Sequence, residues 1–214
     1  MNTIWLYYKR FEFLLVSFLL LMFGTTYITG RFAMHFIVTQ NLLAGLLVFY
    51  RNKALRIIII SIILVHTMWV VGPDYSNWIR QHEIKPELYL LYFSIISYWV
   101  YKPIFKTKTV SSEMVSAVMC GFILLCFIST FIFSEVETMQ PNSFSNIGTG
   151  RDKLSYLNYF SVTTLLTVGF GDIVPLTLVA KRWVMFMALA GHFYTVFVTA
   201  IVIGKYLNNK TSSS

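Results

Sequence analysis

Residues 156–175 read YLNYFSVTTLLTVGFGDIVP, a short apolar run followed by alternating glycines. Residues 156–166 have the composition of a helix of about 11 residues. At about 1.5 Å per residue, such a helix reaches only half-way across a bilayer. Gly169 and Gly171 then alternate with larger residues, and glycine readily adopts a positive φ. We therefore expect a short helix followed by an extended segment with an unusual backbone.

The composition around this stretch is that of a membrane protein. Of the 214 residues, 57% are hydrophobic and 12% are charged, whereas a soluble domain has roughly 25% charged residues. A disordered chain needs few apolar residues and a high net charge, so this composition excludes disorder. It also argues against a soluble globular domain, because a water-facing surface of this size needs more charge.

Six apolar runs predict an all-α membrane protein with six transmembrane helices. The fourth run is the shortest, but counting it as a crossing keeps the basic residues that follow the second run on the inner side. The short helix and its extended segment lie between the fifth and sixth helices. The predicted runs are residues 13–28, 33–50, 55–71, 88–101, 115–133 and 183–207.

The distribution of basic residues predicts the orientation. With six crossings and a cytoplasmic N-terminus, ten Lys and Arg residues fall in inner segments and seven in outer segments, which together make the 17 of the chain. Inner loops of membrane proteins carry the excess of Lys and Arg. We therefore expect both termini to be cytoplasmic in a multi-pass protein of the plasma membrane.

The order of a half-length helix and a glycine-rich return strand has a physical consequence. Non-helical backbone at membrane depth is tolerated only where it is buried in protein or lines a wet cavity. Positive φ at alternate residues lets successive carbonyls point the same way, which makes a ladder of oxygen ligands. One chain supplies one side of that ladder, so closure needs several chains around an axis. The partly negative C-terminal end of the short helix favours a cation.

The run Thr167-Val168-Gly169-Phe170-Gly171-Asp172 resembles the selectivity-filter signature of potassium channels. The match extends over residues 156–175, and weaker similarity to six-helix potassium channels covers roughly the last hundred residues. This resemblance implies a peripheral four-helix domain at 1–112, a pore domain at 113–207 and a short cytoplasmic tail at 208–214.

The resemblance also assigns roles to individual residues. Backbone carbonyls of Thr167, Val168, Gly169 and Phe170 would bind K⁺ in place of its hydration shell, and Gly171 would shape the outer mouth. Phe170 stands where tyrosine is commonest, so we expect a less tightly braced filter. The residues implied to support the filter are Asp172, Glu135, Tyr159 and Thr163, and Gly191 is the implied gating hinge of the inner helix.

The fourth run contains no charge that a membrane field could move. Six-helix potassium channels often carry Arg or Lys at every third position of this helix, and each charge that crosses the field contributes about 2.3 kcal/mol per 100 mV. Residues 88–101 contain no Arg, Lys, Asp or Glu. We therefore expect a channel that is not intrinsically voltage-sensing, with no soluble regulatory domain in the chain.

The sequence as a whole predicts a homotetrameric potassium channel rather than an enzyme. It needs no cofactor apart from K⁺ ions in the filter, and the basic excess follows from membrane topology rather than from nucleic-acid binding. Two alternatives stay open. One is a non-selective cation channel, and the other is a non-conducting membrane scaffold or modulatory subunit that retains a pore-like hairpin.

Overall fold

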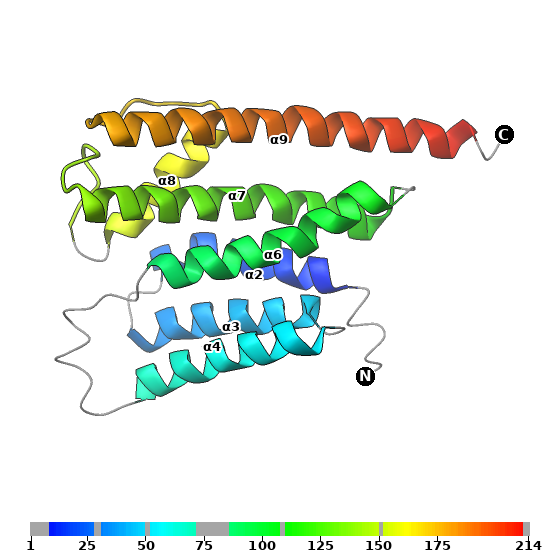
Figure 1. Cartoon of the computed structure of the whole chain (residues 1–214), viewed down its shortest axis with the longest axis horizontal. Coiled ribbons are helices and arrows are strands. Elements are labelled where there is room, and N and C mark those ends of the chain that lie inside the picture. Colours follow the sequence, from blue (N-terminus) through cyan, green and yellow to red (C-terminus); the bar gives the residue numbers. More distant parts are fainter. Residues whose placement is uncertain are drawn as a thin grey trace. The chain divides into compact units, whose positions relative to one another are not determined.

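The computed structural model describes residues 9–27, 31–49, 52–71, 86–107, 110–149 and 152–211. The described residues form an all-helical chain (Figure 1). Its seven helices are α2 (Arg10–Tyr27), α3 (Arg31–Val48), α4 (Lys53–Val71), α6 (Pro86–Lys106), α7 (Ser112–Met139), α8 (Asp152–Leu165) and α9 (Leu178–Thr211).

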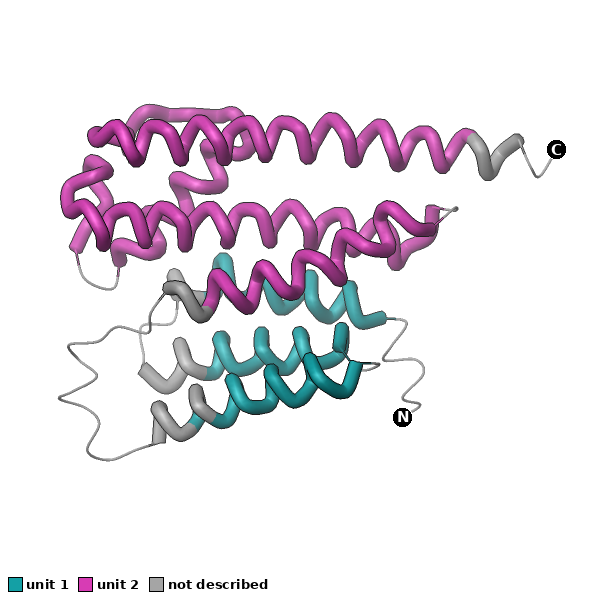
Figure 2. Tube along the Cα trace, in the orientation of Figure 1, with its two compact units in different colours: residues 1–85 teal, residues 86–214 magenta. Residues whose placement is uncertain are grey.

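The chain divides into two compact units, Met1–Lys85 and Pro86–Ser214 (Figure 2). The sequence placed its domain boundary after residue 112, whereas the structural division falls before α6. The reason is that α6 packs along α7 through aromatic rings. Phe93 stacks on Phe127 with ring centroids 5.1 Å apart, so α6 belongs with the part of the chain that carries the filter sequence.

The first unit holds α2, α3 and α4, in which α3 packs against both of the other helices. Two polar residues interrupt the second apolar run of the sequence, and the structure pairs both with α2. Asn41 Nδ2 donates to Ser17 Oγ at 2.8 Å, and Gln40 Nε2 donates to the Ser17 carbonyl at 3.2 Å. Such bonds between helices satisfy polar groups that would be costly to leave unpaired in lipid.

In the second unit, α7 contacts α6, α8 and α9. Among the described residues, α7 and α9 are the helices long and apolar enough to cross a membrane. The remaining four crossings stay predictions. Tyr194, near the middle of α9, donates its hydroxyl to the Val118 carbonyl in the N-terminal part of α7, which ties the two long helices together.

Several helices are longer than their apolar runs. The fourth run covers 14 residues, but α6 has 21, because the helix continues through Lys102 and Pro103 to Lys106. At about 1.5 Å per residue, this length reaches the thickness of a bilayer core of about 30 Å. The short helix α8 begins at Asp152 rather than at Tyr156. The Gly72–Pro73 breaker after the third run lies outside the described residues.

Candidate functional site

The chain leaves α8 as an extended segment and then turns into α9 (Figure 1). The first amides of this segment bond back to α8. Thr167 N donates to the Thr164 carbonyl at 3.0 Å, and the amides of Val168 and Gly169 both donate to the Thr163 carbonyl, at 2.8 and 3.3 Å. Three successive N–H groups therefore face the short helix.

These bonds fix the direction of the carbonyls. In a planar trans peptide, the N–H of one residue and the carbonyl of the preceding residue point in opposite directions. The carbonyls of Leu166, Thr167 and Val168 therefore point away from α8. Exposed backbone oxygens thus gather on the side of the segment opposite its supporting helix.

The backbone angles of the segment alternate. Thr167 has φ +58°, Gly169 has φ +57° and Gly171 has φ +80°, and these are the only residues of the described stretch 166–172 with positive φ. No atom lies within 4 Å of a Cβ built on Gly169 or Gly171, so backbone conformation rather than crowding requires these glycines. Thr167 is β-branched, and its left-handed backbone is strained.

A ladder of aligned carbonyls is a ligand set for a desolvated cation. Strained backbone persists where the surroundings hold it in place, and it gathers at functional sites. Among the described residues, no group of three or more His, Cys, Asp and Glu could hold a metal ion.

Tyr159 lies behind the extended segment and contacts it twice. Its ring stacks on the Phe170 ring with centroids 6.5 Å apart and planes within 2°. A hydrogen bond with the Asp172 carboxylate raises the pKa of the Tyr159 phenol above its usual range. The Asp172 carbonyl in turn accepts from Asn146 Nδ2 at 2.8 Å. The extended segment is thus held by the ring stacking at Phe170 and by the hydrogen bonds that Asp172 makes with Tyr159 and Asn146.

The loop that follows α7 pairs with the chain that follows Asp172. Ser145 N donates to the Val174 carbonyl at 3.0 Å, and Leu176 N donates to the Ser143 carbonyl at 2.7 Å. Val174 N donates to Ser145 Oγ at 2.9 Å. Phe144 and Pro175 form an isolated antiparallel bridge. This short ladder fixes the C-terminal end of the extended segment to the loop.

Glu137 organises that loop from the end of α7. Its carboxylate accepts from the amides of Asn142 at 3.0 Å, Ser143 at 2.8 Å and Phe144 at 3.2 Å. Lys153, in the first turn of α8, lies 3.3 Å from the same carboxylate. Glu137 is 5% exposed, so it is a buried charge with several charged or dipolar partners, as a buried carboxylate requires.

A buried aromatic cluster lies beneath this network. The Phe133, Phe144 and Phe160 rings, from α7, the loop and α8, contact one another with centroids 5.4 to 5.7 Å apart. All three side chains are less than 10% exposed. This cluster joins the C-terminal end of α7 to α8 and so sets the position of the short helix.

Gly191 is a close-packing position. A Cβ added there would lie 3.0 Å from Cα, Cβ and Cγ of Leu165, at the end of α8. The missing side chain therefore lets α9 approach the short helix directly. The gating hinge implied for Gly191 stays a prediction.

The structure brings most of the expected support residues together and adds three that the sequence missed. Thr163 acts through its carbonyl, and Tyr159 contacts both Phe170 and Asp172. Glu135 is half-buried on α7, and the carboxylate that binds the loop belongs to Glu137. No motif marks the missed residues, since their roles depend on how the loop folds; they are Glu137, Asn146 and Ser145.

Residues 119–208 match a family of ion channels, described as "Ion channel". This range holds most of α7 and all of α8, the extended segment and most of α9. No curated protein matches the chain, and no solved structure matches it.

Proposed function

We propose that the chain is the subunit of a potassium-selective channel, a proposal that the match of residues 119–208 to an ion-channel family supports. The observation that carries this proposal is the alternation of φ at Thr167, Gly169 and Gly171 together with amides bonded to α8. A pore that replaces the hydration shell of an ion needs aligned carbonyls. In this proposal K⁺ is the cargo, held in turn by the carbonyls of residues 167–170.

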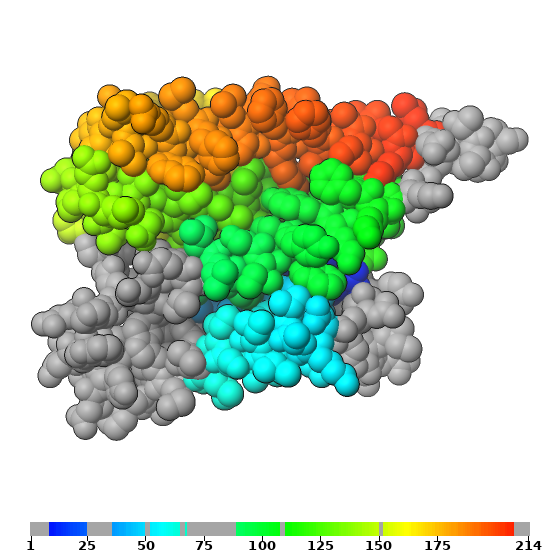
Figure 3. All heavy atoms as spheres, viewed as in Figure 1, coloured from blue at the N-terminus to red at the C-terminus, as the bar shows by residue number. Residues whose placement is uncertain are grey.

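The proposed channel is a homotetramer. One chain offers one wall of the ladder, and that wall is open in a single subunit, since Phe170 is 70% exposed and Val168 is 49% exposed. A closed ring of identical subunits covers such surfaces by symmetry. The side chains of α9 form a continuous exposed surface along the second unit (Figure 3), which also suits a helix that meets copies of itself around a pore.

One face of α9 suits the inner cavity of such a pore. His192, Thr195 and Thr199 follow one another at spacings of three and four, so they share a helix face, and all three are exposed. Gly191, four residues before Thr195, borders this face and packs against Leu165. Polar side chains within a membrane helix favour a wet cavity over lipid, so this polar face would line the path of the ion.

The proposed orientation puts the filter mouth and the loop after α7 on the outer side, with both chain ends inside. The peripheral helices then act as scaffold rather than as a voltage sensor, because residues 88–101 carry no formal charge. A conductance that rises steeply with voltage in symmetric potassium, without blocking ions, would argue against this part of the proposal.

The proposal is tested by ion flux from vesicles. Purified protein reconstituted into potassium-loaded liposomes should release K⁺ when an ionophore for protons compensates the charge. Gly169→Ala should abolish this release, because alanine disfavours the φ of +57° at that position. Equal release of Na⁺ would favour a non-selective cation channel, and no release from a well-folded tetramer would favour the scaffold alternative.

A further inference from the structure

The polar face of α9 carries an imidazole in the middle of a long apolar helix. Between Trp183 and Gly204, His192 is the one residue of the Asp, Glu, Lys, Arg and His types. Such residues are costly inside a membrane, and they mark ion pathways and binding sites. His192 is exposed, and its ring contacts the ring of the neighbouring Phe193, with centroids 6.5 Å apart. Within the described part of the chain, no hydrogen bond or ion pair explains its presence.

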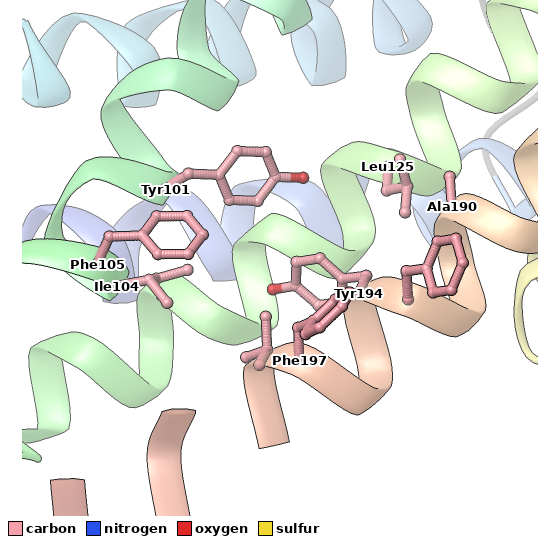
Figure 4. A pocket seen from close by; sticks show the side chains of 9 residues that line it. Tyr101, Ile104, Phe105, Leu125, Ala190, Tyr194 and Phe197 are labelled. Atoms are coloured by element: carbon pink, nitrogen blue, oxygen red, sulfur yellow. The ribbon is translucent and has the colours of Figure 1, made fainter. Parts of the chain in front are cut away.

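An apolar cavity of the second unit shows which way His192 points. This cavity of about 250 Å³ lies between α6, α7 and α9, and Ala190 and Tyr194 of α9 line it (Figure 4). His192 is two residues from each of them, and two residues turn an α-helix by about 200°. The imidazole therefore lies on the side of α9 opposite the cavity. In Figure 1 the extended segment after α8 also runs on the side of α9 away from α6.

A close contact between helices sets the depth of His192. A Cβ added to Gly191, the preceding residue, would lie 3.0 Å from Cα of Leu165, which is the last residue of α8. The carbonyl ladder begins two residues later, at Thr167. In the proposed orientation, His192 thus lies at the level of the inner end of the ladder. The inference that follows rests on the proposed function.

The helices around His192 place no carboxylate beside it. Along α9 the nearest charged residues are Arg182 and Lys205, which at about 1.5 Å per residue lie about 15 and 20 Å away. On α7, residues 114–134 contain no charged residue, and α8 carries its charged residues in its first turn. The neutral imidazole offers one unprotonated nitrogen, which is therefore the side-chain ligand that these helices present at this level.

Four copies of this imidazole surround the axis of the proposed tetramer. Imidazole nitrogen suits Cu²⁺, Ni²⁺ and Zn²⁺, whereas Mg²⁺ and Ca²⁺ prefer carboxylate, carbonyl and water oxygens. Nitrogens arranged around a fourfold axis match the square-planar geometry of Cu²⁺ and Ni²⁺. We propose that the four His192 imidazoles bind one such divalent transition-metal ion at the inner end of the ladder. An ion held there lies in the path of potassium, so it blocks conduction.

Copper binding to the purified full-length protein tests the site. The background protein carries His35→Gln, His66→Gln and His82→Gln, which replace the other three of the four histidines in the chain. It should bind one Cu²⁺ per four chains, and its electron paramagnetic resonance spectrum should show several equivalent nitrogen ligands. Adding His192→Gln should abolish this binding. If the background protein does not fold, the wild type and the single variant His192→Gln should differ by the same one Cu²⁺ per four chains.

Potassium flux gives a second measurement on the same proteins. Cu²⁺ or Ni²⁺ supplied from the inner side should block flux through the wild type, while Mg²⁺ at the same concentration should not. The fraction of the flux that Cu²⁺ or Ni²⁺ removes should fall to zero in His192→Gln, whatever the flux of this variant without metal.

A tetramer that conducts potassium but binds no Cu²⁺, or binds it equally well with His192→Gln, would overturn the metal site and leave the pore standing. One Cu²⁺ per chain with a single nitrogen ligand would also overturn it, because each imidazole would then act alone. Copper binding that depends on His192 in a tetramer without potassium flux would count against the pore and still support the metal site.

Discussion

Replacing Glu137 by Gln should loosen the outer end of the pore domain, whereas replacing Glu135 should not. The Glu137 carboxylate is 5% exposed and accepts from three backbone amides at 2.8 to 3.2 Å. Gln keeps the size of the side chain but has one acceptor oxygen, and its amide group would point donors at other donors. Glu137→Gln therefore changes the charge and the number of acceptor oxygens at this position while leaving the packing of the side chain the same.

The cost can be worked from the contacts. A hydrogen bond to a charged group contributes about 1.5–3 kcal/mol and a neutral one about 0.5–1.5 kcal/mol. Losing the charge on two or three such bonds costs about 2–4 kcal/mol. The ion pair with Lys153 adds little, because the Lys153 side chain is 34% exposed and solvent screens it. Glu135 is half-buried, and its change should stay within about 0.5 kcal/mol.

Thermal unfolding of the purified protein in detergent measures the difference. A loss of 2–4 kcal/mol lowers the unfolding midpoint of a chain of this size by roughly 5–15 °C. Glu137→Gln should show this shift and should also lose potassium flux earlier on heating, while Glu135→Gln should match the wild type. A large shift for Glu135→Gln with none for Glu137→Gln would show that the sequence-based assignment is right and the structural reasoning wrong.

Three further outcomes follow from the site. Gly191→Ala should lower the free energy of unfolding by about 1–3 kcal/mol through overpacking, because the added Cβ would meet Leu165 at 3.0 Å. Gly204→Ala is the control: nothing lies within 4 Å of its added Cβ, so it should not lower the unfolding midpoint. The Tyr159 phenol has a pKa raised by its hydrogen bond with Asp172. The stabilisation that this hydrogen bond gives is therefore present at neutral pH and is lost as the pH rises through the raised pKa. Tyr159→Phe should remove this alkaline step from a pH titration of potassium flux, and an unchanged step would contradict the contact. Potassium flux through Thr199→Cys should be blocked by a charged thiol reagent applied from the inner side, while flux through Phe193→Cys should not. The native Cys120 and Cys126 are buried and give little background reaction. Equal block of both variants would place the polar face of α9 elsewhere.

The sequence predicted the parts of the fold that follow from local chemistry. Run length predicts a short helix before the extended segment, and the structure has one, although it has 14 residues and begins at Asp152. The glycines permit positive φ at Gly169 and Gly171, and the structure has positive φ at both. The positive φ of Thr167 was not predicted, since a β-branched residue disfavours it. It arises from the bonds that the segment makes to Thr163 and Thr164.

The network around the loop could not be read from the sequence. Glu135 and Glu137 are two residues apart on one helix, and no local pattern says which one turns toward the loop. Ser145 and Asn146 resemble ordinary loop residues until the loop pairs with residues 174–176. The division of the chain before α6 likewise depends on ring packing between Phe93 and Phe127, which periodicity does not reveal.

In the proposed channel, the carbonyl ladder of residues 167–170 selects potassium over sodium. The most direct measurement is the reversal potential of purified, reconstituted protein with potassium on one side of the bilayer and sodium on the other. We predict a reversal close to the potassium equilibrium potential, moving toward zero in Gly169→Ala if any current survives. A wild-type reversal near zero in the same gradient would contradict the claim.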